Sequence, residues 1–228
     1  MNVAIILLAG KSERLNNDTL KQFIRINDKY LFEYSLSTFE STKDIDSILL
    51  VTLKDKISFV KDIVKDRYNK IIDVVSGGKN RQESVHLALE YLKQHQIDEN
   101  DNILIHDSAR PLVSKEVITS CLESLSIHDS ITSAIKAYDT VSIVKDNKVI
   151  EILDRNYVYL HQTPQAFKFL TIYEAHNIAS KSKMYDKTDD VSLIINQGKE
   201  VYIVDGDVDN FKITTESDLK RFIKMINK

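Results

Sequence analysis

The stretch VAIILLAG, residues 3–10, decides how the rest of the chain is interpreted. Seven consecutive apolar residues, from Val3 to Ala9, end at a glycine that polar residues follow. A short apolar run without alternation is typical of a strand that is buried on both faces, as in a parallel sheet. The run has no basic leader and is too short to span a membrane. We therefore interpret it as a buried first strand.

Further short runs of β-branched or aliphatic residues follow along the chain. They cover Ser47–Leu53, Lys70–Val75, Asn102–His106 and Ser130–Lys136. Apolar residues recur at helical spacing over Tyr30–Glu40, Gln82–Lys93 and Glu216–Ile226. Alternation of strands and helices is the pattern of an α/β fold with a parallel sheet.

The middle of the chain breaks this alternation. Thr140–Val144 and Lys148–Leu153 are strand-like runs joined by the turn Lys145-Asp146-Asn147, which predicts a β-hairpin. The edges of a projecting hairpin need to be covered by another chain. We therefore expect an arm at about residues 138–158 that makes the protein a homodimer.

Composition limits the classes of protein to which the chain belongs. Lysine and arginine total 31 against 34 aspartate and glutamate, which argues against a polybasic surface for nucleic acid or for a membrane. The 228 residues suffice for one large domain, and we expect a single domain over residues 1–228. The single Cys121 excludes an internal disulfide and fits a cytoplasmic location. Its helical surroundings predict an inert, packed thiol.

The segment after the first strand carries a basic cluster. Its sequence GKS, residues 10–12, resembles the end of a P-loop, but Ile5 stands where that loop needs its first glycine. The segment also contains Lys11, Arg14 and Lys21. These cations form either an anion site or a solvated loop.

Ligands of open parallel sheets bind beyond the carboxyl ends of the strands, so the segments there are candidates for chemistry. These segments are SGGKNRQES, HDSARP, DRNYVYLHQTPQAF, KTDDVSL and DGDVDNFKITT. The two glycines of the first segment permit either close approach of a ligand or a plain turn. Asp107 and Arg110 contact a ligand or pair with each other. His106 and His161 lack a second ligand at metal-site spacing and are interpreted as structural histidines.

Taken in order, the segments resemble a known family. They are LLAGKSERL, LKQF, GGKNRQESV, IHDSARP, YDT, LDRNYVYLHQTPQAF, TDDVSL and GDVDNFKITTESDL. Together they resemble the cytidylyltransferases that activate methylerythritol phosphate, and the relatives of these enzymes that act on ribitol phosphate. The resemblance covers nearly the full chain, and QTPQAF with TDD and NFKITT is its most specific part.

The resemblance implies a nucleotidyltransferase with a Rossmann-like α/β fold. In this fold a mostly parallel sheet is flanked by helices, and a projecting β-hairpin is the dimerisation arm. The implied enzyme transfers CMP from CTP to a polyol phosphate and releases pyrophosphate. The acceptor that the resemblance favours is 2-C-methyl-D-erythritol 4-phosphate. This reaction belongs to isoprenoid precursor synthesis. Mg²⁺ bridges the CTP phosphates, and the resemblance gives no protein ligand to the metal.

The matching motifs also imply roles for individual residues. The catalytic set around the CTP triphosphate is Arg14, Lys21 and Lys212. The nucleotide-binding set is Ala9, Gly10, Gly78, Ser84 and Asp107. The substrate-binding set is Asp107, Thr140, Arg155, Thr163, Thr188 and Lys212. Within this last set, Thr140 and Arg155 reach into the partner subunit's site from the arm.

Four positions depart from the family pattern. Ser12 stands in place of a glycine, and Glu13 adds a negative charge beside the phosphate loop. Leu20 replaces a proline, and Ser108 replaces an alanine, as it does in the relatives that act on ribitol phosphate. No proposed catalytic cation is lost at these positions.

The departures leave two alternatives open. Ser108 favours ribitol 5-phosphate as the acceptor, in teichoic acid or capsule synthesis. A non-catalytic CTP-binding regulator follows if Ser12 and Leu20 disable the phosphate loop. A nicotinamide dehydrogenase is disfavoured because the sequence lacks the G-x-G-x-x-G turn.

Overall fold

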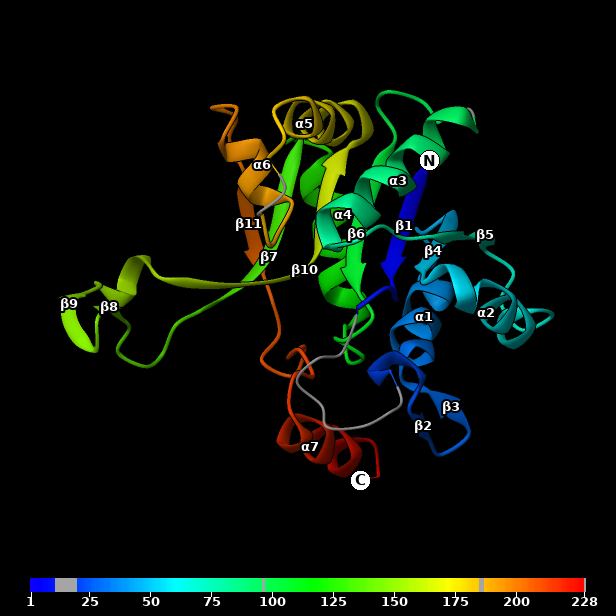
Figure 1. Cartoon of the computed structure of the whole chain (residues 1–228), viewed down its shortest axis with the longest axis horizontal. Helices are drawn as coiled ribbons and strands as arrows, with labels where there is room; N and C mark the ends of the chain where they lie inside the picture. Colours follow the sequence, from blue (N-terminus) through cyan, green and yellow to red (C-terminus); the bar gives the residue numbers. More distant parts are fainter. Residues whose placement is uncertain (11–19, 96, 185–186, 228) are drawn as a thin grey trace.

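The computed structural model describes residues 1–10, 20–95, 97–184 and 187–227. Within them, a seven-stranded sheet has the strand order β11-β7-β10-β6-β1-β4-β5 (Figure 1). The strands are β1 Asn2–Leu7, β4 Ser47–Thr52, β5 Ile71–Ser76, β6 Asn102–Asp107, β7 Ser130–Lys136, β10 Tyr159–Lys168 and β11 Tyr202–Asp205. All of them run parallel except β10, which is antiparallel to both of its neighbours. The predicted α/β fold with a mostly parallel sheet is confirmed.

Strand β1 lies in the sheet interior, paired with β4 and β6. Successive side chains of a strand point to opposite faces, so this one apolar run supplies two cores. Ala4 and Ile6 pack in the core on one face of the sheet, and Val3 and Ile5 pack in the core on the other. This is why an unbroken apolar run predicts a strand in a covered sheet.

Helices cover both faces of the sheet (Figure 1). The core that contains Ile6 is closed by α1 Leu31–Ser41, α2 Ile57–Val64 and α4 Lys115–Leu125. The core that contains Ile5 is closed by α3 Arg81–Gln94, α5 Phe169–Lys181 and α6 Val191–Ile195. Among the described residues, no helix is both long and apolar enough to cross a membrane.

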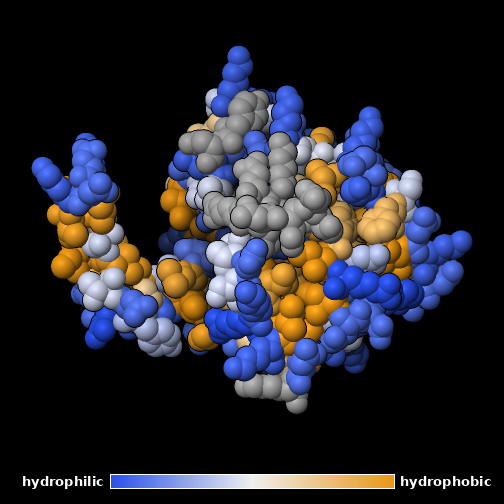
Figure 2. All heavy atoms as spheres, turned by 60° about the horizontal axis from the view of Figure 1, so that its bottom comes forward, coloured by the Kyte–Doolittle hydropathy of each residue, from blue (hydrophilic) through white to orange (hydrophobic). Residues whose placement is uncertain are grey.

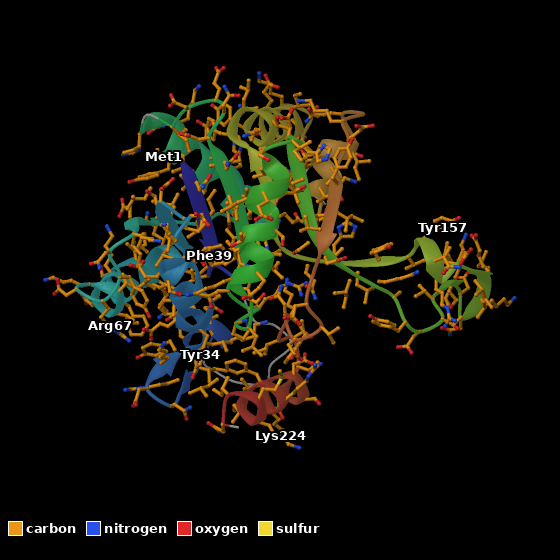
Figure 3. All side chains as sticks on the ribbon, turned by 180° about the vertical axis from the view of Figure 1, so that it is seen from behind. Met1, Tyr34, Phe39, Arg67, Tyr157 and Lys224 are labelled. Carbon is orange, nitrogen blue, oxygen red and sulfur yellow. The ribbon has the colours of Figure 1, made fainter. Side chains whose placement is uncertain are left out.

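The C-terminal helix α7, Glu216–Ile226, packs at the carboxyl edge of the sheet (Figure 1). Thr215 caps it, because its side chain accepts a hydrogen bond from the Asp218 amide and the Asp218 carboxylate accepts one from the Thr215 amide. Phe222 is buried against the ring of Tyr34 on α1, with 5.0 Å between the ring centroids. Figure 3 shows Tyr34 on the side of α1 that faces α7. This contact fixes the segment that leads into α7 beside the site.

Small elements complete the fold. They are the two-stranded sheet of β2 Arg25–Ile26 and β3 Lys29–Tyr30, and the 3₁₀ turns Lys21–Phe23, Lys54–Lys56 and Arg155–Tyr157. Cys121 on α4 is fully buried, and burial raises the pKa of its thiol to about 12. The prediction that Cys121 is packed in the core is confirmed.

The predicted hairpin is present as β8 Ser142–Lys145 and β9 Lys148–Ile152. Asp146 and Asn147 both have positive φ, 51° and 59°, as a two-residue hairpin turn requires. The hairpin is a sheet of its own that projects from the body, with Tyr157 near its base (Figures 1 and 3). Its apolar side chains are exposed, and Figure 2 shows them gathered on the arm.

Strand β10 contains most of the segment DRNYVYLHQTPQAF, which the apolar pattern places beyond the ends of the strands. This expectation is wrong, because Tyr159–Lys168 pairs with β6 on one side and β7 on the other. Its polar residues Gln162, Thr163 and Gln165 are buried inside the sheet, where they hydrogen-bond to Asp207, Asp107 and Asp190. An apolar pattern therefore does not predict a central strand whose buried polar side chains have specific hydrogen-bond partners.

Candidate active site

Asp107 is the last residue of β6, at the carboxyl edge of the sheet. Its carboxylate pairs with Arg81 Nε at 3.1 Å and with Lys212 Nζ at 2.7 Å. Arg81 begins α3, and Lys212 lies in the segment that leads to α7. Three segments that are distant in the sequence thus bring their charges together at this edge.

Arg81 bridges two carboxylates. Its Nε pairs with Asp107, and its Nη1 lies 2.7 Å from Asp190 Oδ2. The Asp190 side chain is 1% exposed, and its other oxygen accepts a hydrogen bond from His176 Nε2 at 3.0 Å. The four charges of Asp190, Arg81, Asp107 and Lys212 alternate in sign, so their burial is compensated pair by pair.

The neighbouring charges decide the ionisation of this group. Burial opposes the charged form of Asp107, but Arg81 and Lys212 hold the pKa of Asp107 well below its usual range. Burial likewise opposes the charge on Asp190, and Arg81 and the His176 hydrogen bond lower the pKa of Asp190. The two carboxylates raise the pKa of Arg81 although burial opposes its charge. All three groups therefore stay ionised at neutral pH.

Thr163 of β10 lies directly against Asp107. Its Oγ1 accepts a hydrogen bond from the Asp107 amide at 3.2 Å and lies 3.0 Å from His106 Nδ1. His106 Nε2 lies 3.0 Å from the Arg110 carbonyl oxygen, which can only accept. The proton of the neutral imidazole therefore lies on Nε2, and Nδ1 accepts from Thr163. Both His106 and His161 are hydrogen-bonded, as their interpretation as structural histidines requires.

Acid should destabilise the protein through His106. Burial lowers the pKa of His106 from 6.5 to about 4. Between these values the unfolded chain binds a proton that the folded chain does not, so stability is lost as pH falls from about 6.5 to about 4. The loss amounts to about 3 kcal/mol. Denaturant unfolding at a series of pH values measures it.

Two variants test the assignment of this acid loss to His106. His106→Asn should reduce the pH dependence of unfolding in this window, because this side chain no longer titrates. His95→Gln, which removes an exposed histidine at the end of α3, is the control for the loss of one imidazole. An unchanged pH profile in His106→Asn would contradict the assignment.

The loops after β1 and β5 approach each other closely. A Cβ atom on Gly77 would lie 2.8 Å from both Ala9 Cβ and Ser84 Oγ, so only glycine fits there. The Gly78 amide donates to Ser84 Oγ at 3.0 Å, and Ser84 Oγ donates to the Asn80 carbonyl at 2.8 Å. Three residues of the predicted nucleotide-binding set, Ala9, Gly78 and Ser84, therefore lie side by side.

Lys21 is placed beside the segment that carries Lys212. Lys21 Nζ donates a hydrogen bond to the Ile213 carbonyl, and the Ile213 amide donates to the Ala109 carbonyl at 2.8 Å. Gln22 joins this region to the residues that follow β1, since its Nε2 donates to the Gly10 carbonyl at 3.0 Å. The structure therefore brings the segments of Lys21 and Lys212 to the edge that holds Asp107. Arg14, the third predicted cation, lies outside the described residues, as do Lys11, Ser12 and Glu13.

The remaining predicted residues lie at different places. Thr188 is exposed and stands two residues before Asp190. Thr140 and Arg155 are exposed on the arm, where Arg155 Nη1 donates to the Tyr138 carbonyl at 3.3 Å. The arm projects away from the site of its own chain (Figure 1). Contact of Thr140 and Arg155 with substrate thus remains a prediction that requires a second subunit.

A family model described as IspD, 2-C-methyl-D-erythritol 4-phosphate cytidylyltransferase, matches residues 2–226. The chain belongs to this family. It is therefore a nucleotidyltransferase by family, as the sequence motifs imply. The site around Asp107 is accordingly the candidate active site of an IspD-family enzyme.

Individual relatives agree with the family match. The 2-C-methyl-D-erythritol 4-phosphate cytidylyltransferase of Clostridium beijerinckii is 39% identical over 98% of this chain and 98% of its own length. The enzyme of the same name from Thermosipho melanesiensis is 37% identical over 96% of this chain and 95% of its own length.

Solved structures agree as well. The 4-diphosphocytidyl-2C-methyl-D-erythritol synthase of Anaerococcus prevotii aligns with a TM-score of 0.85 and 30% identity, over 99% of this chain and 96% of its own. The IspD structure of Francisella tularensis aligns with a TM-score of 0.82 and 28% identity, over 97% and 98%.

Three residues of this candidate site were not singled out from the sequence. Arg81 and Asp190 stand inside the motifs GGKNRQESV and TDDVSL, but no role was assigned to them. His176 belongs to an ordinary amphipathic helix and gave no signal. The pairing of Asp107 with Arg110 is not found, because the Arg110 guanidinium donates instead to the carbonyls of Asn210 and His161. The Asp107 carboxylate forms its ion pairs with Arg81 and Lys212.

Proposed function

We propose that this chain transfers CMP from CTP to 2-C-methyl-D-erythritol 4-phosphate and releases pyrophosphate. Membership of the IspD family supports the reaction. The observation that carries the proposal is the meeting of Arg81 and Lys212 on Asp107, beside the segment of Lys21. It gives a carboxyl-edge site with fixed charges of both signs.

The reaction requires that two anions meet. An oxygen of the acceptor phosphate attacks the α-phosphorus of CTP, the new P–O bond forms, and the bond to the β-phosphate oxygen breaks. Two unit charges about 4 Å apart repel by about 4 kcal/mol at an effective dielectric constant near 20. Lys21, Lys212 and Arg14 are proposed to offset this repulsion. A phosphate monoester is already ionised at neutral pH, so the chemistry needs no general base.

Lys212 is suited to a change of partner. Its side chain is 41% exposed, whereas Asp107 is 12% exposed and is also held by Arg81. The ammonium group can therefore turn toward a phosphate while Arg81 continues to neutralise Asp107. This makes Arg81 a fixed counter-ion and Lys212 the mobile cation.

The substrates are proposed to bind on two sides of Asp107. The nucleotide side consists of Ala9, Gly10, Gly78 and Ser84. Their backbone amides and carbonyls are proposed to hydrogen-bond to the base. Asp107, Thr163, Thr188 and Lys212 form the acceptor side. Thr140 and Arg155 complete it from the partner subunit's arm.

Mg²⁺ is proposed to enter with the nucleotide. The described residues contain no group of three or more His, Cys, Asp or Glu suited to a metal ion. Asp107 and Asp190 are already paired with Arg81. This donor set fits an ion held mainly by phosphate oxygens and water, which is how Mg²⁺ commonly binds. When bound, the ion neutralises phosphate charge.

The arm is proposed to bind a second copy of the chain. Ile143, Val144, Val149, Ile150 and Ile152 are exposed on it, an apolar surface that a monomer would leave in water. A homodimer covers this surface and brings Arg155 to the other subunit's site. We also propose that the chain folds as a single domain over residues 1–228 and acts in the cytoplasm.

Mixed dimers should recover activity that each variant lacks. Lys21→Ala and Arg155→Ala should each be nearly inactive, because every site of either homodimer lacks one contact. After subunit exchange, half of the dimers are mixed and one of their two sites is intact, so about a quarter of wild-type activity should return. Pyrophosphate release by the mixture measures this, and no recovery would contradict sites shared between subunits.

One assay tests the proposed function. Pyrophosphate release is measured with four nucleoside triphosphates, each combined with 2-C-methyl-D-erythritol 4-phosphate or ribitol 5-phosphate. Turnover with CTP and the first acceptor is the expected result. Preference for ribitol 5-phosphate would establish the alternative acceptor. CTP binding without pyrophosphate release would establish a regulator instead of an enzyme.

A further inference from the structure

His176 of α5 is a fully buried histidine with one partner. Its Nε2 lies 3.0 Å from Asp190 Oδ1, and its side chain is 0% exposed. No described residue is a hydrogen-bond partner of its other ring nitrogen, Nδ1. An unpaired buried polar atom destabilises the fold, so an apolar side chain would serve better if packing were the only role. The hydrogen bond to Asp190 therefore explains why a histidine, and not an apolar residue, stands at position 176.

That bond holds one side of the Asp190 carboxylate. Oδ1 accepts from His176, and Oδ2 accepts from Arg81 Nη1 at 2.7 Å. The Asp190 amide donates to Gln165 Oε1 at 3.0 Å, which fixes its backbone as well. With both oxygens engaged, the carboxylate cannot rotate without losing a bond.

The fixed carboxylate orients Arg81 in turn. The guanidinium is planar, so holding Nη1 on Asp190 sets the direction in which Nε meets Asp107, at 3.1 Å. Arg81 and Lys212 share the Asp107 carboxylate. If Arg81 were less firmly placed, Asp107 would depend more on Lys212 and would keep that ammonium group from the phosphates.

We propose that His176 is a positioning residue, which acts through Asp190 and Arg81 to keep Asp107 neutralised and Lys212 available. The inference rests on the proposed function, because it assigns Lys212 to the reacting phosphates. His176 touches no reacting atom. Its loss should lower kcat by about 10- to 100-fold, the effect expected when a reacting group is displaced by a fraction of an ångström to an ångström.

The neighbouring imidazole supplies a matched control. His86 of α3 stacks on His176 with 6.0 Å between the ring centroids, and both rings line a cavity of about 450 Å³ between α3 and α5. Asp190 faces His176, with Arg81 behind it; Lys79 and Glu83 line the same cavity, and His86 is a titratable neighbour. His86 has no bond to Asp190 among the described residues, so His86→Phe should retain wild-type kcat.

Two substitutions at position 176 separate the hydrogen bond from packing. His176→Phe keeps a flat ring and removes the donor, whereas His176→Gln offers an amide donor near the position of Nε2. We expect the loss in kcat for His176→Phe and a return to within about threefold of wild type for His176→Gln. Equal losses in both variants, or wild-type kcat in His176→Phe, would overturn the proposal. KM for CTP and the melting temperature are measured alongside kcat.

A double-mutant cycle tests whether the effect passes through Asp190. His176→Phe combined with Asp190→Asn should be no slower than Asp190→Asn alone, because the contact is already lost. Losses that multiply would overturn the relay. If His176→Phe does not fold, His176→Leu takes its place in the cycle. If no such variant folds, a role in folding has been shown and the proposal fails.

Nitrogen-15 NMR of the histidines tests the contact without activity. The wild-type protein should show His176 with its proton on Nε2, and a ring protonated on Nδ1 alone would overturn the proposal. A wild-type protein that gives this signal but releases no pyrophosphate would instead refute the proposed function. The two failures are therefore distinguishable.

Discussion

Replacing Arg81 with methionine should destabilise the protein by about 3–5 kcal/mol and remove most of its activity, because the change strips a shared counter-ion from two carboxylates. Asp190 is 1% exposed, and the substitution leaves its charge with the His176 hydrogen bond alone. Asp107 would retain Lys212, the cation that the reaction is proposed to need. Urea unfolding and pyrophosphate release measure the two effects.

Two further variants show whether the buried charge causes this loss. Arg221→Met breaks an exposed pair with Asp209, whose atoms lie 3.4 Å apart, and should change stability by less than about 1 kcal/mol. Arg81→Met combined with Asp190→Asn should be more stable than Arg81→Met alone, because the uncompensated charge is gone. Equal stability of the single and double variants would show that lost packing, and not charge, is responsible.

The parts of the fold that follow from an apolar pattern were predictable. The unbroken run from Val3 to Ala9 predicts β1, and the similar runs predict β4, β5, β6 and β7, with ends within one or two residues of those observed. Strand β10 has no such run, since Gln162 and Thr163 stand in its middle and bond to Asp207 and Asp107. Its burial depends on partners that are distant in the sequence, so no local pattern reveals it.

The candidate site, like the fold, was predictable only in part. Topology predicts that residues after parallel strands lie at one edge, and the segments of Lys21, after β1, and Lys212, after β11, do meet there. The partners of Asp107 were not predictable, because Arg81 lies 26 residues away and Lys212 lies 105 residues away. A motif shows which residues are candidates. Only the folded chain shows which of them neutralises the others.

Removing the ammonium group of Lys212 should lower kcat by about 100- to 1,000-fold, the range found when one group that stabilises charge in a transition state is removed. The expected variant is Lys212→Ala, measured by pyrophosphate release at saturating CTP. Stability should change little, because the Lys212 side chain is 41% exposed and Arg81 still neutralises Asp107. This combination of a large kinetic effect and a small effect on folding distinguishes Lys212 from Arg81.

Lys220→Ala is the matched control, since Lys220 is an exposed lysine on α7, a few residues beyond Lys212. Lys220→Ala should retain wild-type kcat, because Lys220 is not among the residues proposed to contact the phosphates. Lys212→Arg keeps the charge but carries a broader, planar group, and should recover only part of the lost rate. If Lys212→Ala turned over at the wild-type rate, the pair with Asp107 would be structural. The mobile cation would then have to be sought among the other positive groups of this edge.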